Sequence, residues 1–132
     1  MTGVQTCALP ISLFAVGTER DHIAPWVSVY KVRLLTVVDF TFALASGGHN
    51  TGIVAAPDNP KARYSLDHAP ADAPYVPPEA WAERAERHDG SWWPAWFAWL
   101  HGHSGAWTEP PAMGAKGWPP LEPAPGRYVR MP

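Results

Sequence analysis

Two residue types that can share a proton stand in separate polar turns near the start of the chain. Asp21 lies in "TERDH" and His49 lies in "SGGHN". An imidazole titrates near neutrality, so it can take a proton from a thiol or hydroxyl and return it to a leaving group. A carboxylate on the other ring nitrogen fixes the tautomer and stabilises the imidazolium. Asp21 and His49 are therefore the candidate acid and base of a nucleophilic mechanism.

The same two residues also have structural explanations that need no catalysis. A helix is expected to begin at Pro25, and Asp21 could cap it. His49 could lie in an ordinary loop, in which Gly47 and Gly48 permit a tight turn. The spacing alone leaves both interpretations open.

The strands and the helix expected around the Asp21 and His49 turns predict that these two turns meet at one edge of a sheet. The apolar run "LFAV" (residues 13–16) ends at Gly17 and predicts a short buried strand. A helix is expected from Pro25, with apolar residues at helical spacing at Val27, Tyr30 and Leu34. "FTFALA" (residues 40–45) is β-branched and aromatic and predicts a second strand. Such a βαβ unit has parallel strands, and both turns then lie at the carboxyl edge, where catalytic groups gather.

The second half of the chain is organised differently. Residues 55–78 are rich in proline and lack sustained periodicity, which predicts an irregular arm. Residues 78–88 predict an amphipathic helix, closed by Asp89 and Gly90. The tail from Glu109 is expected to be extended, with "RYVRM" as a possible terminal strand.

Residues 91–102, "SWWPAWFAWLHG", predict a helix that Ser91 can cap and Gly102 ends. Its apolar residues form two adjacent rows: Trp92, Trp96 and Trp99, then Trp93, Phe97 and Leu100. A helix that is apolar on most of its circumference needs burial on more than one side, so core or interdomain packing is the favoured interpretation. A surface for a partner or a polymer is the alternative.

Composition excludes several classes of function. The chain has 132 residues, with 10 basic and 12 acidic side chains and a net charge of -2, and it has no basic run. Nucleic acid is therefore not an expected partner. No apolar stretch is long enough and free enough of charge to span a membrane. The pair His101 and His103 has no second pair of ligands at the usual spacing, so no metal site is expected.

Four stretches resemble the carboxyl-terminal part of polyhydroxyalkanoate synthases, which are also called poly(3-hydroxybutyrate) polymerases. They are "GTERDHIAPW", "SGGHNTGI", "GSWWPAWFAWL" and "EPAPGRYV", and the resemblance runs from Leu13 to the end. "DHIAPW" and "GSWWP" are specific in combination. The resemblance implies an α/β fold: the last βαβ unit of a partial α/β-hydrolase fold, followed by an irregular Pro-rich arm and Trp-rich helices.

The resemblance also implies a reaction. These synthases resemble α/β-hydrolases with a cysteine in place of serine, and they transfer 3-hydroxyacyl groups from coenzyme A thioesters onto a growing polyester. Asp21 matches the catalytic aspartate and His49 the catalytic histidine, whereas Glu19 and His22 match no triad member. The spacing alone could not have excluded Glu19. No cofactor is implied beyond the coenzyme A thioester substrate, and the intact enzyme is expected to be a cytoplasmic homodimer at the surface of polyester granules.

The nucleophile is where the chain departs from this pattern. The family's cysteine lies between glycines at a strand-to-helix elbow far upstream, whereas Cys7, the only cysteine, lies in "VQTCALP" just before the first strand. Cys7 is therefore not the expected nucleophile, and the chain alone is expected to be inactive. Because "TGVQTCALPI" back-translates to the end of a common sequencing adapter, residues 1–11 are hypothesised to be a non-native leader. Residues 12–132 are then the carboxyl-terminal part of a catalytic domain, and an uninterrupted genomic match to the leader codons would contradict this.

Two other functions fit the same residues. An intracellular polyester depolymerase or another α/β-hydrolase would use the same acid and base with a serine, and the upstream elbow, G-x-C-x-G or G-x-S-x-G, would discriminate them. A non-enzymatic module could instead bind granules or a partner through the Trp-rich helix.

Overall fold

The computed structural model describes residues 12–132 and centres on a mixed four-stranded sheet. The Cys7 and leader hypotheses concern residues outside the described part of the chain. The strands lie in the order β1 (Leu13–Thr18), β2 (Phe40–Ala45), β3 (Arg63–Ala69) and β4 (Glu86–Asp89). β1 and β2 are parallel, whereas β3 is antiparallel to both β2 and β4. The prediction of two parallel strands at these positions is confirmed.

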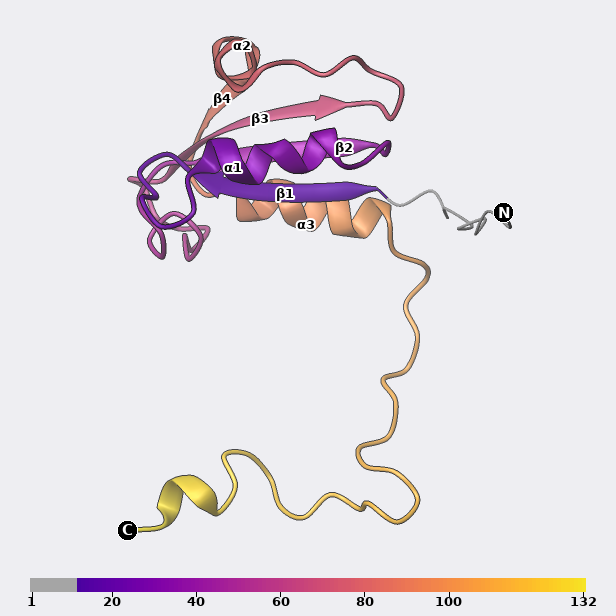
Figure 1. Ribbon diagram of the computed structural model, residues 1–132. Helices are drawn as coiled ribbons and strands as arrows, with labels where there is room; N and C mark the ends of the chain where they lie inside the picture. The colour runs from indigo at the N-terminus through magenta and orange to yellow at the C-terminus, as the bar shows by residue number, and fades with distance from the viewer. Residues whose placement is uncertain (1–11) are drawn as a thin grey trace, which may run out of the picture.

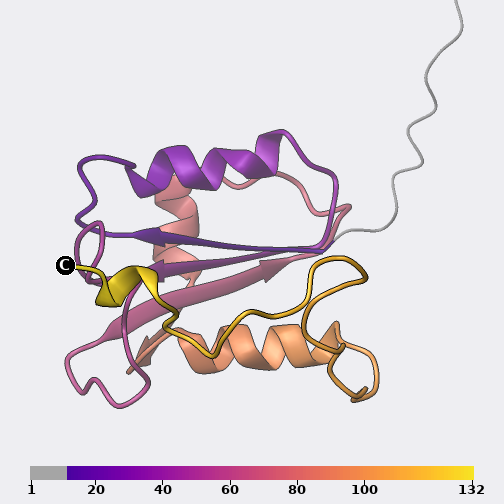
Figure 2. The same cartoon turned by 90° about the horizontal axis from the view of Figure 1, so that it is seen from below.

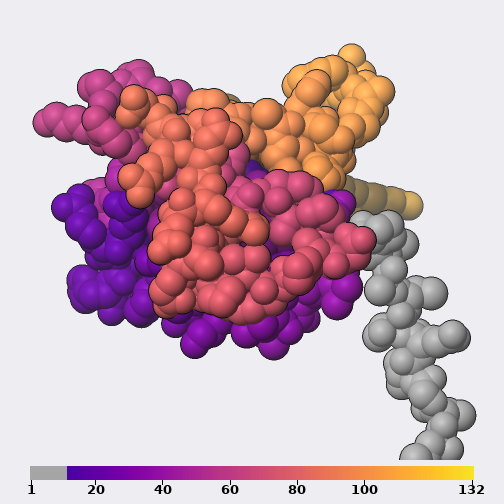
Figure 3. Space-filling model, turned by 90° about the horizontal axis from the view of Figure 1, so that it is seen from above, coloured from indigo at the N-terminus to yellow at the C-terminus, as the bar shows by residue number. Residues whose placement is uncertain are grey.

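Three helices cover the two faces of the sheet. They are α1 (Trp26–Tyr30), which continues as a 3₁₀ turn, η1 (Lys31–Leu34), α2 (Pro78–Arg84) and α3 (Trp93–Gly102). α1 and α2 lie on one side of the sheet and α3 on the other (Figures 1 and 2). Seen from above, the segment from the end of β3 through α2 occupies the middle of the visible surface (Figure 3). None of the helices in residues 12–132 is long and apolar enough to cross a membrane.

The buried row of the first helix differs from the predicted one. Tyr30 is buried as expected, but Leu34 is 58% exposed. The helix tightens to 3₁₀ geometry at Lys31, and this rotates the following residues, so Arg33 takes the buried position instead.

The Pro-rich arm was predicted to be irregular, and that is wrong for its centre, because β3 lies there. Pro60 and Pro70 lie on either side of the strand and so remove no hydrogen bond from it. Tyr64 and Leu66 pack toward the cluster under α3, while Asp67 accepts hydrogen bonds from Arg84 on the α2 side. The strand was not predicted because polar or charged residues alternate with apolar ones along most of it, so the sequence lacks a continuous apolar run there.

Two further expectations fail at element ends. The helix predicted for residues 78–88 stops at Arg84, because Ala85 has extended backbone geometry, and the charged residues after it form β4. The possible terminal strand is absent, since Tyr128–Arg130 form a 3₁₀ turn, η2, in a tail that runs away from the sheet (Figure 1).

An aromatic cluster lies on each face of the sheet. The first joins the sheet to α1 and α2: Tyr30, Phe40, Phe42, Leu44, Trp81 and Ala85. The second lies under α3 and includes Ala43, Ala45 and Trp92, with Trp93 and Trp96 packed against it. Only one side of α3 is covered, and Phe97 on its outer side is 50% exposed. The described residues therefore do not bury this helix on more than one side, although its apolar circumference predicted such burial.

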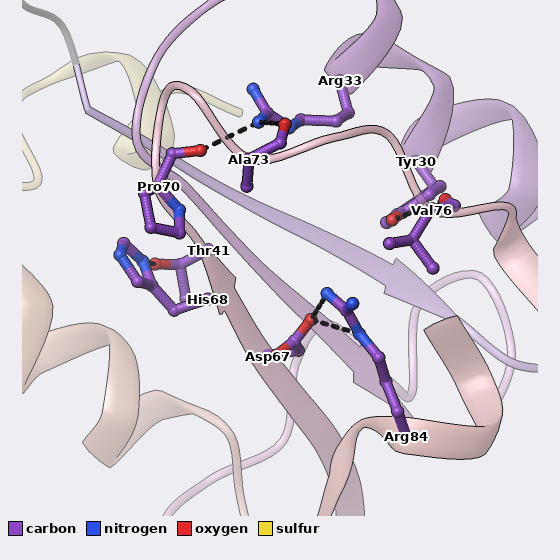
Figure 4. Close-up of polar contacts among 9 residues, drawn as sticks. All are labelled: Tyr30, Arg33, Thr41, Asp67, His68, Pro70, Ala73, Val76 and Arg84. Carbon is purple, nitrogen blue, oxygen red and sulfur yellow. Dashed lines mark hydrogen bonds and ion pairs between the residues drawn. The ribbon is translucent and has the colours of Figure 1, made fainter. Parts of the chain in front are cut away.

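Arg33 ties the first crossover to the segment after β3 (Figure 4). Its guanidinium is buried and donates hydrogen bonds to five backbone carbonyls: those of Thr36, Val38, Pro70, Ala71 and Ala73. Carbonyls can satisfy a buried guanidinium because all of its N–H groups are donors. This network fixes the end of the crossover opposite the turns of Asp21 and His49.

The isolated chain is expected to aggregate or to pack loosely. β1 is an edge strand with a half-buried apolar run, and the side chains of Leu34, Leu35 and Val37 are 58%, 84% and 84% exposed. An open apolar edge is a template for pairing with other chains. Thermal unfolding followed by circular dichroism, together with amide spectra, tests this. A cooperative transition in a monomer with well-dispersed amide signals would contradict it.

Candidate active site

The two candidate residues lie in the turns that follow the parallel strands. Asp21 comes after β1 and His49 after β2, so both turns emerge at the carboxyl edge, on the left in Figure 1. The two turns are joined by backbone hydrogen bonds, from the Glu19 N–H to the Ala45 carbonyl and from the Arg20 N–H to the Gly47 carbonyl, both 2.9 Å. The parallel register therefore brings the acid and the base together.

Asp21 and His49 are in direct contact. The Nδ1 atom of His49 lies 2.7 Å from Oδ2 of Asp21. The other oxygen of Asp21, Oδ1, accepts hydrogen bonds from the backbone N–H groups of Ile23 and Ala24, both at 2.9 Å. α1 starts after Pro25 without a side-chain cap, so Asp21 holds its own turn and does not cap the helix.

The surroundings of Asp21 favour its ionised form. The hydrogen bond from the Ala24 N–H, together with those from His49 and the Ile23 N–H, lowers the pKa of Asp21 to about 2, although burial acts in the opposite direction. The Asp21 side chain is 7% exposed and that of His49 is 45% exposed. A fixed carboxylate thus faces an imidazole that solvent and reactants can reach.

The contact with Asp21 determines which imidazole nitrogen of His49 is free to accept a proton. With Nδ1 donating to the carboxylate, Nε2 carries the lone pair that can accept a proton. Within residues 12–132, Nε2 has no hydrogen-bond partner, and no hydroxyl lies against it as a nucleophile would. Within the described residues, the pair can therefore exchange a proton at Nε2, and no nucleophilic side chain is hydrogen-bonded to that nitrogen.

Glycines hold the His49 turn in place. Gly47 has a φ of +111°, which favours glycine, and Gly52 packs so closely that a Cβ there would lie 2.5 Å from Cγ2 of Thr18. Gly48, which the sequence also suggested, does not have a positive φ, and a Cβ there would be 3.8 Å from its nearest neighbour. Gly47 and Gly52 are therefore the glycines that the geometry requires.

The structure does not bring the other candidates to His49. Glu19 is exposed and lines a hollow with Arg63 and Arg87, and His22 is exposed. His103 lies at the surface at the end of α3, where its Nδ1 is 2.8 Å from the Trp99 carbonyl oxygen. In the described part of the chain no three His, Cys, Asp or Glu side chains converge as metal ligands would.

Sequence reasoning missed one group of residues next to the site. Ser91 accepts a hydrogen bond from the Trp93 N–H at 3.1 Å, as a capping residue would, but its hydroxyl also donates to the carbonyl of Ala55. The indoles of Trp92 and Trp93 bond to the same loop, beyond His49. Sequence analysis assigned Ser91 to a cap and the two tryptophans to apolar rows, but no pattern indicated that their side chains donate hydrogen bonds to this loop.

Comparisons with known proteins find curated relatives of this chain. No protein-family model matches the chain. It is 40% identical over 135 residues to poly(3-hydroxyalkanoate) polymerase 2 of Ectopseudomonas oleovorans, and the match covers 96% of the chain and 23% of that protein. This chain is a relative of poly(3-hydroxyalkanoate) polymerases. The poly(3-hydroxyalkanoate) polymerase subunit PhaC of Cupriavidus necator is 37% identical over 94% of the chain and 22% of its own length.

A third relative agrees, and the polymerase resemblance expected from the four motifs is confirmed. Poly(3-hydroxyalkanoate) polymerase of Methylorubrum extorquens is 38% identical over 92% of the chain and 20% of that protein. The chain spans less than a quarter of the length of each of these polymerases. What it shares with them is therefore one segment, which contains the Asp21 and His49 turns.

Proposed function

We propose that the chain is the carboxyl-terminal part of a polyhydroxyalkanoate polymerase and carries the aspartate and histidine of a Cys-Asp-His triad. The observation that carries this is the 2.7 Å contact between Nδ1 of His49 and Oδ2 of Asp21 at the carboxyl edge of parallel strands. It occurs in a chain related to polymerases over nearly its whole length. The intact protein is then an acyltransferase that builds polyester from 3-hydroxyacyl-coenzyme A.

The geometry suits both halves of this reaction. In acylation, Nε2 of His49 takes the proton of a cysteine thiol upstream of the chain, the thiolate attacks the thioester carbonyl, and the coenzyme A thiolate leaves with that proton. In elongation, His49 takes the proton of a 3-hydroxyl, whose oxygen attacks the acyl-cysteine carbonyl. The C–S bond breaks, and the leaving cysteine sulfur takes that proton from His49. Asp21 stabilises the imidazolium formed in each step.

The remaining properties follow from the resemblance. The substrates are 3-hydroxyacyl-coenzyme A and the growing polyester, and no further cofactor is needed. The intact enzyme works in the cytoplasm at the granule surface as a homodimer. Residues 12–132 alone hold no cysteine and are expected to be catalytically inert.

A chimaera tests the proposal. In it, residues 12–132 replace the matching segment of polymerase 2 of Ectopseudomonas oleovorans, and the protein is incubated with (R)-3-hydroxyacyl-coenzyme A. Release of coenzyme A together with polymer supports the proposal. Release of coenzyme A with only free hydroxy acid indicates a hydrolase instead, and a folded but inert chimaera contradicts the assignment.

Gly52→Ala in the chimaera is expected to lower kcat on the order of 10²-fold, since misplacing a catalytic group by ~1 Å costs about that much. The new Cβ would lie 2.5 Å from Thr18 Cγ2 and 2.9 Å from the Ser46 carbonyl oxygen, so the His49 loop must move. Steady-state kinetics measure the effect. Gly48→Ala is the matched control, because its Cβ has room. Equal kcat values for the two variants would show that the close approach of Gly52 is unimportant.

A further inference from the structure

Three consecutive side chains at the start of α3 donate hydrogen bonds to the loop that follows His49. The Ser91 hydroxyl bonds to the Ala55 carbonyl, the Trp92 indole N–H to the Gly52 carbonyl at 3.0 Å, and the Trp93 indole N–H to the Ile53 carbonyl at 2.9 Å. We name the side chains of Ser91, Trp92 and Trp93 the α3 clamp. Three donors aimed at one short loop constrain its position more than a single contact could.

The α3 clamp is itself fixed to the strand that leads to His49. The side chain of Trp92 packs with Ala43 and Ala45 of β2, and Ser91 and Trp92 are only 5% and 7% exposed. Buried donors of this kind rarely lack a partner, because an unpaired buried polar group is costly. The helix and β2 therefore form one frame that holds the loop.

Backbone hydrogen bonds connect the clamped carbonyls to the catalytic turn. The Gly52 N–H donates to the Gly48 carbonyl at 3.0 Å, and the Val54 N–H donates to the Asn50 carbonyl at 2.9 Å. The first bond encloses His49 in a compact turn, and the second joins that turn to residues 52–54. Holding residues 52–55 in place thus holds the backbone of His49 in place as well.

We infer that Ser91, Trp92 and Trp93 are positioning residues for His49, and this inference rests on the proposed function. Asp21 fixes the imidazole through Nδ1, but it cannot keep the backbone of the His49 loop from moving. The α3 clamp supplies that second restraint. It gives the motif "GSWWP" a chemical role, since tryptophan adds an N–H donor to an apolar ring, which phenylalanine cannot do.

The test uses Trp92→Phe and Trp93→Phe in the chimaera, with Trp96→Phe as the matched control. Trp96 lies on the same helix and packs against the same cluster, but its indole makes no hydrogen bond within residues 12–132. In the clamp variants, kcat is expected to fall roughly ten- to a hundredfold while KM stays within about twofold, because the loss concerns catalytic geometry. Trp96→Phe is expected to lower the melting temperature similarly but to keep kcat.

An isosteric substitution separates the N–H group from packing. Trp92 replaced by 3-benzothienylalanine keeps the ring volume but has sulfur in place of N–H, so kcat is expected to fall as in Trp92→Phe. If Trp92→Phe does not fold, this variant decides alone. Wild-type kcat in the benzothienylalanine variant, or an equal kcat loss in Trp96→Phe, would overturn the inference.

A double variant tests whether the effect of Trp92 on activity acts through His49. In a His49→Gln background, Trp92→Phe is expected to have no further effect on residual activity, because the group it positions is gone. A full additional loss in that background would overturn the inference while leaving the proposed function intact. Unchanged activity of His49→Gln itself would overturn the proposed function, and the two failures are therefore distinguishable.

Discussion

His49→Gln in the chimaera is expected to lower the rates of both acylation and polymer growth by about 10⁴-fold or more, leaving only residual activity. The amide of glutamine cannot take a proton from a thiol or a hydroxyl at neutral pH. Because Nδ1 of His49 is hydrogen-bonded to Asp21, Nε2 is the nitrogen that accepts the proton. The Asp21 carboxylate cannot take over this role of His49. Single-turnover release of coenzyme A measures acylation, and polymer yield measures elongation.

A neighbouring histidine provides the control for this variant. His22 is exposed and follows Asp21 directly, but makes no hydrogen bond to the Asp21–His49 pair in the described residues. His22→Gln is expected to keep both activities. Polymer yield for His49→Gln within about tenfold of the unmodified chimaera would be too small a loss for the residue that acts as general base.

The sequence predicted β1 and β2 because their continuous apolar residues match positions that are covered by helices on both faces of the sheet. "LFAV" and "FTFALA" are apolar runs that end in turn residues, and both lie between helices on either face of the sheet. β3 and β4 could not be found in this way. "ERHD" continues a helical pattern, and it becomes a strand only because β3 offers hydrogen-bonding partners across positions 63–66.

The sequence could predict which turns meet at the site, because the order and direction of the strands determine this. Parallel strands place the turns after them at one edge, so sequence alone could bring an acidic turn close to His49. It could not choose between Glu19 and Asp21, because the choice depends on how the turn folds. Asp21 turns toward His49 while its other oxygen binds the Ile23 and Ala24 N–H groups. The hydrogen bonds of Trp92 and Trp93 depend wholly on tertiary structure, so no spacing could reveal them.

The charge on Asp21 sets the expectation for pH dependence. Because its folded-state pKa is lowered to about 2, the carboxylate stays ionised at ordinary assay pH, and it would be protonated only as the pH fell through about 2. Lowering the pH from neutrality to 5 therefore cannot mimic removal of this charge. An acid loss of activity in that range therefore reports a group other than Asp21.

Asp21→Asn is expected to reduce elongation far more than acylation in the chimaera. Asparagine keeps the shape but loses the negative charge that orients and stabilises the imidazolium, a change that costs about 10⁴-fold in the serine-protease template. A thiol has a reference pKa of about 8.5 and is intrinsically nucleophilic, so acylation should survive in part. The 3-hydroxyl is far less acidic and needs the stronger base, so polymer growth should bear most of the loss.

Single-turnover acylation measured beside polymer yield tests this inequality for Asp21→Asn, with Glu19→Gln as the control. Glu19 lies two residues earlier in the same turn, but its carboxylate makes no contact with His49, so its loss should leave both steps unchanged. Equal losses in the two steps, or an unchanged polymer yield, would show that the Asp21 carboxylate does not support His49 as base.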